Sequence, residues 1–196
     1  MANVITISRE YGAGGTTIGK AVADRLGIEF LDKEIILTTA YEAQVNVESV
    51  FKLDEMAPSG GIFSNGIMDF YNKPLSEKLF EAQSEVIKMF GERGNCLIVG
   101  RNANHILRGF DNTLHVFLCG SLSYRRNKMM EKEMYQGISE AKMTDLINTV
   151  DKRRKKYCDY YTNTNFGEAI NYDVSLDVSR LGIDKCIDII CDLASK

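Results

Sequence analysis

Hydrophobic residues in this chain fall into short runs that alternate with segments of helical period. Runs rich in β-branched and apolar residues predict five strands, at residues 4–7, 29–31, 96–99, 114–118 and 173–177. Apolar residues spaced three and four apart predict helices at residues 17–26, 33–43, 74–93, 122–136, 139–160 and 183–194. Strands alternating with helices predict an α/β fold of three layers, a five-stranded parallel sheet flanked by helices.

One segment breaks this pattern. Residues 54–73 contain Pro58, Gly60, Gly61 and Gly66 and keep no period, which predicts a loop or irregular insertion. The chain has 196 residues, a length that suits a single domain spanning residues 1–196.

Composition narrows the class of protein. The hydrophobic share of 44% and charged share of 26% are ordinary for a globular chain. No apolar run approaches the roughly 18 residues of a membrane span. The first residues contain no basic region or cleavage site, so we expect no signal sequence. The five cysteines form no C-x-x-C pair, and two histidines are too few for a histidine-based zinc site. We expect a cytoplasmic protein with no membrane partner.

Charge is distributed unevenly. The net charge is −3, yet residues 121–157 hold ten Lys and Arg against five Asp and Glu. One basic segment on an acidic protein favours a local polyanion site over general nucleic-acid binding. A nucleic-acid-binding module would rest only on the run at residues 152–156, with no aromatic stacking platform beside it.

The glycine cluster after the first strand has the position of a phosphate-binding loop. Ligands of parallel sheets bind at the carboxyl ends of the strands, and a glycine loop before a helix turns backbone N–H groups toward an anion. In the usual pattern G-x-x-x-x-G-K-[ST], the lysine reaches the phosphates and the hydroxyl holds Mg²⁺. Here Arg9 replaces the first glycine and Gly15 replaces the lysine, while Gly14 and Thr16 are retained. As a bare pattern, a plain glycine turn between a strand and a helix is an equal alternative.

Taken whole, the chain resembles the cytidylate kinase family, in particular its divergent cytidylate kinase-like branch. The opening Ser8-Arg9-Glu10-Tyr11-Gly12-Ala13-Gly14-Gly15 is similar to that branch, where the lysine is also missing. Further resemblances follow in order at Leu31-Asp32, Val99-Gly100-Arg101-Asn102, Arg125 with Lys128, Asp151-Lys152-Arg153, and Asn171-Tyr172-Asp173 with Ser179.

The resemblance implies a P-loop kinase fold with a helical lid. It implies an ATP-dependent phosphotransferase that uses Mg²⁺ and acts on a nucleoside monophosphate, CMP-like, or a related small acceptor. Within the domain, residues of about 33–93 would form an acceptor-binding helical insertion and residues 121–160 a basic lid. The partners would be small nucleotides, and the protein a monomer or a homodimer.

The resemblance also implies roles for single residues. Backbone amides of the loop would bind phosphate, and Thr16 would contact Mg²⁺ directly or through water; the loop residues are Gly12, Ala13, Gly14, Gly15, Thr16 and Thr17. The catalytic cations would be Arg9, Arg125 and Arg153. The acceptor would contact Asp32, Arg101, Asn102 and Asp151.

Each role has a structural alternative. Thr16, Asp32 and Asp151 could cap helices, Arg101 could form an ion pair, and the basic helices could present solvated faces. Arg154, Lys155 and Lys156 are assigned to such a face.

Two departures from the family pattern put CMP in doubt as the acceptor. Thr38 stands where the family has an arginine, and Asn102 where it has an aspartate. Gly15 in place of the lysine supports a second hypothesis, a nucleotide-binding or regulatory protein with impaired catalysis.

Overall fold

The computed structural model describes residues 3–36 and 75–195. Its centre is a parallel sheet in the order β2-β3-β1-β4-β5. The strands are β1 (Val4–Arg9), β2 (Glu29–Leu31), β3 (Cys96–Val99), β4 (Thr113–Cys119) and β5 (Val174–Asp177). The predicted five-stranded parallel sheet is therefore confirmed.

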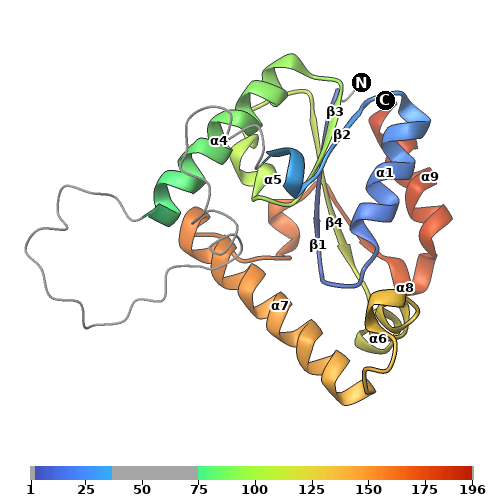
Figure 1. Cartoon of the computed structure of the whole chain (residues 1–196). Helices are drawn as coiled ribbons and strands as arrows, with labels where there is room; N and C mark the ends of the chain where they lie inside the picture. The colour runs from blue at the N-terminus through green and yellow to red at the C-terminus, as the bar shows by residue number, and fades with distance from the viewer. Residues whose placement is uncertain (1–2, 37–74, 196) are drawn as a thin grey trace, which may run out of the picture.

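Two helical layers cover the sheet (Figure 1). One face packs on α1 (Gly15–Leu26) and α9 (Ile183–Ala194), which join β1 side chains such as Ile5 and Ile7 in one core. The other face packs on α4 (Leu75–Arg93) and α5 (Ala103–Ile106), with Val4 and Ile98 between them. Alternate residues of β1 thus enter opposite cores, as the period of two in a strand requires.

The basic segment lies across the carboxyl ends of the strands (Figure 1). It consists of α6 (Leu122–Met130), a 3₁₀ turn η2 (Glu133–Tyr135) and α7 (Glu140–Thr162). A small core of Met129, Met143 and Ile147 joins α6 to α7. A second 3₁₀ turn η3 (Ala169–Asn171) precedes β5, and α8 (Val178–Leu181) follows it.

One helix ends well before its predicted boundary, and one predicted helix is described only in part. The helix expected over residues 122–136 ends at Met130, and the chain turns so that the hydroxyls of Tyr135 and Tyr11 lie 2.7 Å apart. That contact joins residues far apart in the sequence, so no local pattern could reveal it. The predicted helix at 33–43 begins as expected at Lys33 and passes outside the described residues after Ile36, as do the predicted loop at 54–73 and most of the 33–93 insertion.

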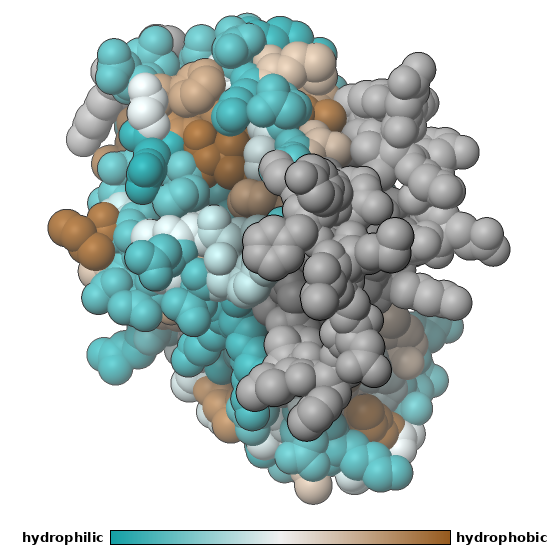
Figure 2. Space-filling model, turned by 90° about the vertical axis from the view of Figure 1, so that its left-hand side faces the viewer, coloured by the Kyte–Doolittle hydropathy of each residue, from teal (hydrophilic) through white to brown (hydrophobic). Residues whose placement is uncertain are grey.

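The ends of the described chain lie on the side of the molecule opposite α6 and α7 (Figure 1). Asn3 donates its N–H to the carbonyl of Asn112 just before β4, at the amino ends of the strands. Among the described residues, the ends of the chain and the loops after the strands therefore lie at opposite edges of the sheet. Where described residues form the surface in Figure 2, it is mostly hydrophilic with scattered hydrophobic patches.

His115 of β4 is held in its neutral form inside the sheet. Its Nδ1 lies 2.8 Å from the Thr6 hydroxyl and its Nε2 lies 3.1 Å from the Thr113 hydroxyl. Burial lowers the pKa of His115 below 6.5, outweighing Asp173, which raises it. Burial and Arg108 lower the pKa of His105 as well.

Because the pKa of His115 is lower in the folded state, the unfolded chain binds this proton first as pH falls. We expect the free energy of unfolding to decrease below pH 6.5 or so, by up to about 1.4 kcal/mol per pH unit for His115. Urea unfolding between pH 7.5 and 5.5 measures this slope. His115→Gln should reduce the slope without abolishing it, since His105 remains; an unchanged slope would contradict the assignment.

Candidate functional site

The loop between β1 and α1 forms an anion site. After Arg9 the chain turns through Gly12 and Gly14, whose φ angles of 84° and 80° favour glycine. Gly14 is the N-cap of α1, and no side chain caps the helix. The amide N–H groups of the first helical turn are therefore available to an anion, which the helix dipole also attracts.

These amides border a cavity of about 300 Å³, here called the loop cavity. Thr16 and Thr17 are exposed on its wall. Lys128 and Lys132 line it from the basic segment. Its walls comprise Arg9, Glu10, Tyr11, Gly12, Gly14, Gly15, Thr16, Thr17, Tyr124, Lys128, Met129, Lys132, Met134, Tyr135, Arg154 and Ile183. A basic cavity at a helix N-terminus has the chemistry of a polyphosphate site.

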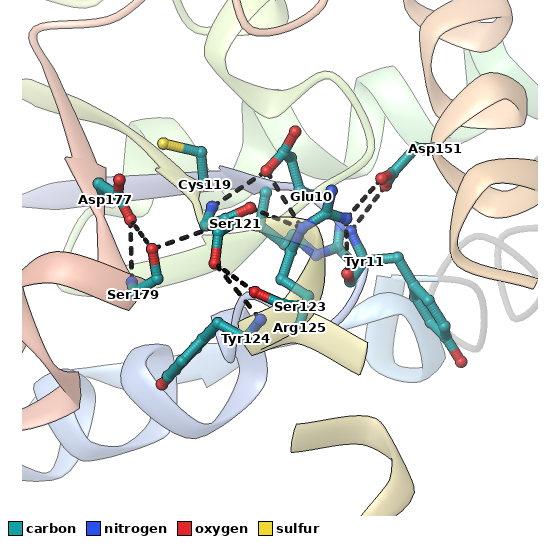
Figure 3. A network of polar contacts seen from close by, with 12 residues as sticks. Glu10, Tyr11, Cys119, Ser121, Ser123, Tyr124, Arg125, Asp151, Asp177 and Ser179 are labelled. Atoms are coloured by element: carbon teal, nitrogen blue, oxygen red, sulfur yellow. Dashed lines mark hydrogen bonds and ion pairs between the residues drawn. The ribbon is translucent and has the colours of Figure 1, made fainter. Parts of the chain in front are cut away.

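Arg125 lies behind the loop and not on the cavity wall. Its Nε donates to the Gly120 carbonyl at 2.8 Å, and its Nη1 donates to the Tyr11 carbonyl at 3.0 Å and to Asp151 at 2.6 Å (Figure 3). Asp151 in turn accepts the Tyr11 N–H at 2.7 Å. The ion pair is buried, with the Arg125 and Asp151 side chains 8% and 13% exposed. These contacts make Arg125 and Asp151 an anchor that ties the loop to α6 and α7.

Glu10 extends this anchor to the end of β4. Its carboxylate accepts the Gly120 N–H at 3.0 Å and lies 3.4 Å from Arg125 Nε (Figure 3). A Cβ at Gly12 would come within 3.0 Å of the Arg125 carbonyl and of Met129. The loop therefore packs directly on α6, and Gly12 is required for contact as well as for conformation.

The Arg9 side chain does not extend into the anion site formed by residues 12–16. Its aliphatic stem crosses Gly15, and its guanidinium lies beside Gly100 at the end of β3. There it borders a second, smaller cavity of about 30 Å³, here called the β3 cavity, as well as the loop cavity. The guanidinium is thus displaced from the lysine position toward the boundary between the two cavities.

Arg154, and not Arg153, faces the site. Arg154 lines both cavities, donates from Nη1 to the Arg9 carbonyl at 2.9 Å, and lies 5.4 Å from the centre of the Tyr11 ring. Arg153 is exposed and lines neither of these cavities. The resemblance implied the reverse arrangement, because it aligned Arg153 with a family motif without regard to the helical face.

The β3 cavity brings together two of the four predicted acceptor residues, Arg101 and Asn102. It is lined by Ser8, Arg9, Gly100, Arg101, Asn102, Arg154, Tyr157 and Phe166. Arg101 and Asn102 are 8% and 9% exposed and adopt the left-handed conformation, with φ of 61° and 53°. Within the described part of the chain, the buried Nδ2 of Asn102 has no hydrogen-bond partner. This amide is therefore available to donate a hydrogen bond to a ligand atom.

Two predicted residues contribute to the structure in other ways. Asp32 lies apart from both cavities and accepts the N–H groups of Glu34 and Ile35, so it caps the helix after β2. Ala13 is fully buried, and its N–H donates to the Glu10 carbonyl at 3.2 Å. Asp32 therefore acts as a helix cap in this structure, which was the structural alternative to its predicted contact with the acceptor.

Sequence reasoning missed several residues of the site: Glu10, Tyr135, Arg154, Tyr157 and Phe166. For Arg154 the sequence did contain a signal. Met143, Ile147, Asp151, Arg154 and Cys158 follow one another at intervals of three or four, which places them on one face of α7. Arg153 lies off that face.

The described residues contain neither a cluster of side chains that could hold a metal ion nor a helix that could span a membrane. In residues 3–36 and 75–195, no group of three or more His, Cys, Asp and Glu side chains is placed to hold a metal ion. No helix in the same residues is long and apolar enough to span a bilayer.

Comparison with known proteins adds a family and a fold. The model of the cytidylate kinase-like family matches residues 4–180. A solved structure of an uncharacterized protein from Eubacterium ventriosum ATCC 27560 is 23% identical over 98% of each chain, with a TM-score of 0.75. No curated protein matches the chain.

Two shikimate kinases are more distant in structure. That from Bacteroides thetaiotaomicron is 16% identical over 98% of each chain, with a TM-score of 0.56. That from Acinetobacter baumannii, solved in complex with shikimate, is 14% identical over 98% of this chain and 92% of its own, with a TM-score of 0.51. These likenesses show the P-loop kinase fold.

Proposed function

We propose that this chain, which belongs to the cytidylate kinase-like family, transfers a phosphoryl group from ATP to a small phosphate-bearing acceptor. The observation that supports this most directly is that the loop cavity and the β3 cavity share Arg9 and Arg154. A phosphoryl group moving from one cavity to the other would pass these two cations. Phosphoryl transfer spreads negative charge over the transferred group, and positioned cations stabilise that charge.

The loop cavity would hold the donor. Backbone N–H groups of residues 12 and 14–17 would bind the β- and γ-phosphates, and Lys128 and Lys132 add positive charge to the same wall. As the lid, α6 and α7 would exclude water from the reacting phosphates. Arg125 and Asp151 would act by holding the loop and the lid together, because their charges are already paired.

The residues present suit a magnesium ion at Thr16. Mg²⁺ keeps several waters and is bound through one or two carboxylates, or in a P-loop through the Ser/Thr hydroxyl, together with substrate phosphates. The exposed Thr16 hydroxyl on the cavity wall provides such a group, so a larger ligand cluster is not required. When bound, the ion would neutralise phosphate charge.

The β3 cavity would hold the phosphate end of the acceptor, because a volume of about 30 Å³ has room for a small group only. Arg9, Arg101 and Arg154 give it three cations, which suit a phosphate group. The Nδ2 group of Asn102 would donate to an acceptor oxygen, while Tyr157 and Phe166 provide aromatic surface. A nucleoside monophosphate such as CMP has these features, and we propose that class as the acceptor.

Gly15 favours a second candidate function, nucleotide binding without transfer. A cation removed from a phosphoryl-transfer site can cost about 3 kcal/mol of transition-state stabilisation, by analogy with the loss of one oxyanion donor.

Purified protein with Mg-ATP should produce ADP in the presence of one member of a nucleoside monophosphate panel. Tight ATP binding without turnover of any member would support the second candidate and contradict the first.

Paired variants separate Arg154 from its neighbour. Arg154→Met should lower kcat about 10- to 100-fold, because the cation shared by both cavities is lost. Arg153→Met makes the same change of charge at an exposed residue of α7 that lines neither cavity, and it should have a much smaller effect. Steady-state kinetics of both variants test this. A larger loss in Arg153→Met would favour the role implied by the family motif over the observed geometry.

A further inference from the structure

Gly15 is a glycine for a reason other than backbone conformation. It is the first residue of α1 and lacks the positive φ of Gly12 and Gly14. In a helix alanine is more favourable than glycine, since glycine loses more conformational freedom. Neither the helix nor the turn therefore requires a residue without a side chain at this position.

The stem of Arg9 occupies the space that a side chain at position 15 would need. A Cβ there would lie 2.7 Å from Cγ of Arg9, closer than real Cβ contacts come, and a tight 3.1 Å from its Cδ. Further along the same side chain, a Cβ at Gly100 would overlap Nη1 of Arg9. Two positions without side chains therefore border the path of Arg9 from the loop to the β3 cavity.

We propose that Arg9 and Gly15 have exchanged the positions that the cation and the glycine occupy in the usual phosphate-loop pattern. The usual pattern places glycine first and the cation seventh, whereas this chain places the cation first and glycine seventh. Gly15 is then a positioning residue: its missing side chain lets Arg9 reach the boundary between the cavities. Arginine at position 9 and a side chain at position 15 exclude one another.

A double-mutant cycle tests the exchange without depending on activity. Gly15→Ala should lower the urea midpoint in the wild-type background and raise it in the Arg9→Gly background, where only helix propensity remains. Gly14→Ala is the matched control, because its φ of 80° is unfavourable for alanine in either background. Equal effects of Gly15→Ala in the two backgrounds would overturn the proposal.

The catalytic consequence rests on the proposed function. Gly15→Ala should lower kcat at least 10-fold with the KM for ATP changed by less than about 3-fold, and should have no further effect on Arg9→Gly. Arg9→Gly with Gly15→Lys should recover at least 10-fold over Arg9→Gly alone, and no recovery would overturn the exchange of roles. If wild-type protein transfers no phosphate, the proposed function fails, and the urea cycle still decides whether Arg9 and Gly15 exclude one another.

Discussion

Replacing Arg9 with alanine is expected to lower kcat about 10²–10³-fold, the loss seen when one preorganised donor is removed from a transition state. The reason is the position of its guanidinium, beside Gly100 and on the wall of both cavities. No other residue of the loop carries a positive charge. Steady-state kinetics measure kcat, and circular dichroism with urea unfolding shows whether the fold is kept.

Arg108→Ala is the matched control for this variant. It removes the same charge from an exposed residue that lines neither the loop cavity nor the β3 cavity. Arg108→Ala should leave kcat within about 3-fold of wild type, since surface changes away from a site usually have small effects. If Arg9→Ala retained a third of the wild-type kcat, Arg9 would have no part in the transfer step.

The largest effect on stability is expected from Arg125→Met. Asp151 and Glu10 would lose their cation, and Asp151 is only 13% exposed. Leaving a buried charge without its partner typically costs about 3–5 kcal/mol. Urea unfolding measures the change in the free energy of unfolding, and calorimetric titration with ATP measures the accompanying loss of affinity as the loop loses its anchor.

A double variant and a surface pair provide the controls. Arg125→Met combined with Asp151→Leu should be more stable than Arg125→Met alone, because no buried charge then remains at position 151. Arg25→Met breaks an ion pair with Asp188 in which both side chains are about half exposed, and it should destabilise far less. Similar losses in Arg25→Met and Arg125→Met would contradict the role of burial.

The fold could be predicted from the sequence wherever one element carries its own pattern. The last helix has the predicted bounds, 183–194, because its apolar spacing is regular and Gly182 precedes it. The end of α6 could not be predicted in this way, since the contact between Tyr135 and Tyr11 is tertiary. The short helices α5 and α8 were also not predicted, each being only four residues long.

The position of the candidate site on the sheet could be predicted from the sequence, but the directions of its side chains could not. The rule that ligands bind beyond the carboxyl ends of strands selected the loop after β1, and the family resemblance selected Arg101 and Asn102. The structure brings Arg9, Arg101 and Asn102 together at the β3 cavity. The direction of the Arg9 side chain depends on Gly100, which follows β3 some ninety positions later in the chain. The family motif pointed to Arg153. Arg154, however, lies on the face of α7 that packs toward the loop and donates to the Arg9 carbonyl.

Because both ends of the described chain lie away from α6 and α7 (Figure 1), either end is suited to attachment. An affinity tag, a fluorophore or a surface tether joined there would stay on the far side of the sheet from the loop cavity. Immobilised protein should then keep both cavities open to solution. The distance from such an end to a second dye on an exposed residue of α7, such as Lys155, could then be recorded on single molecules without altering either cavity.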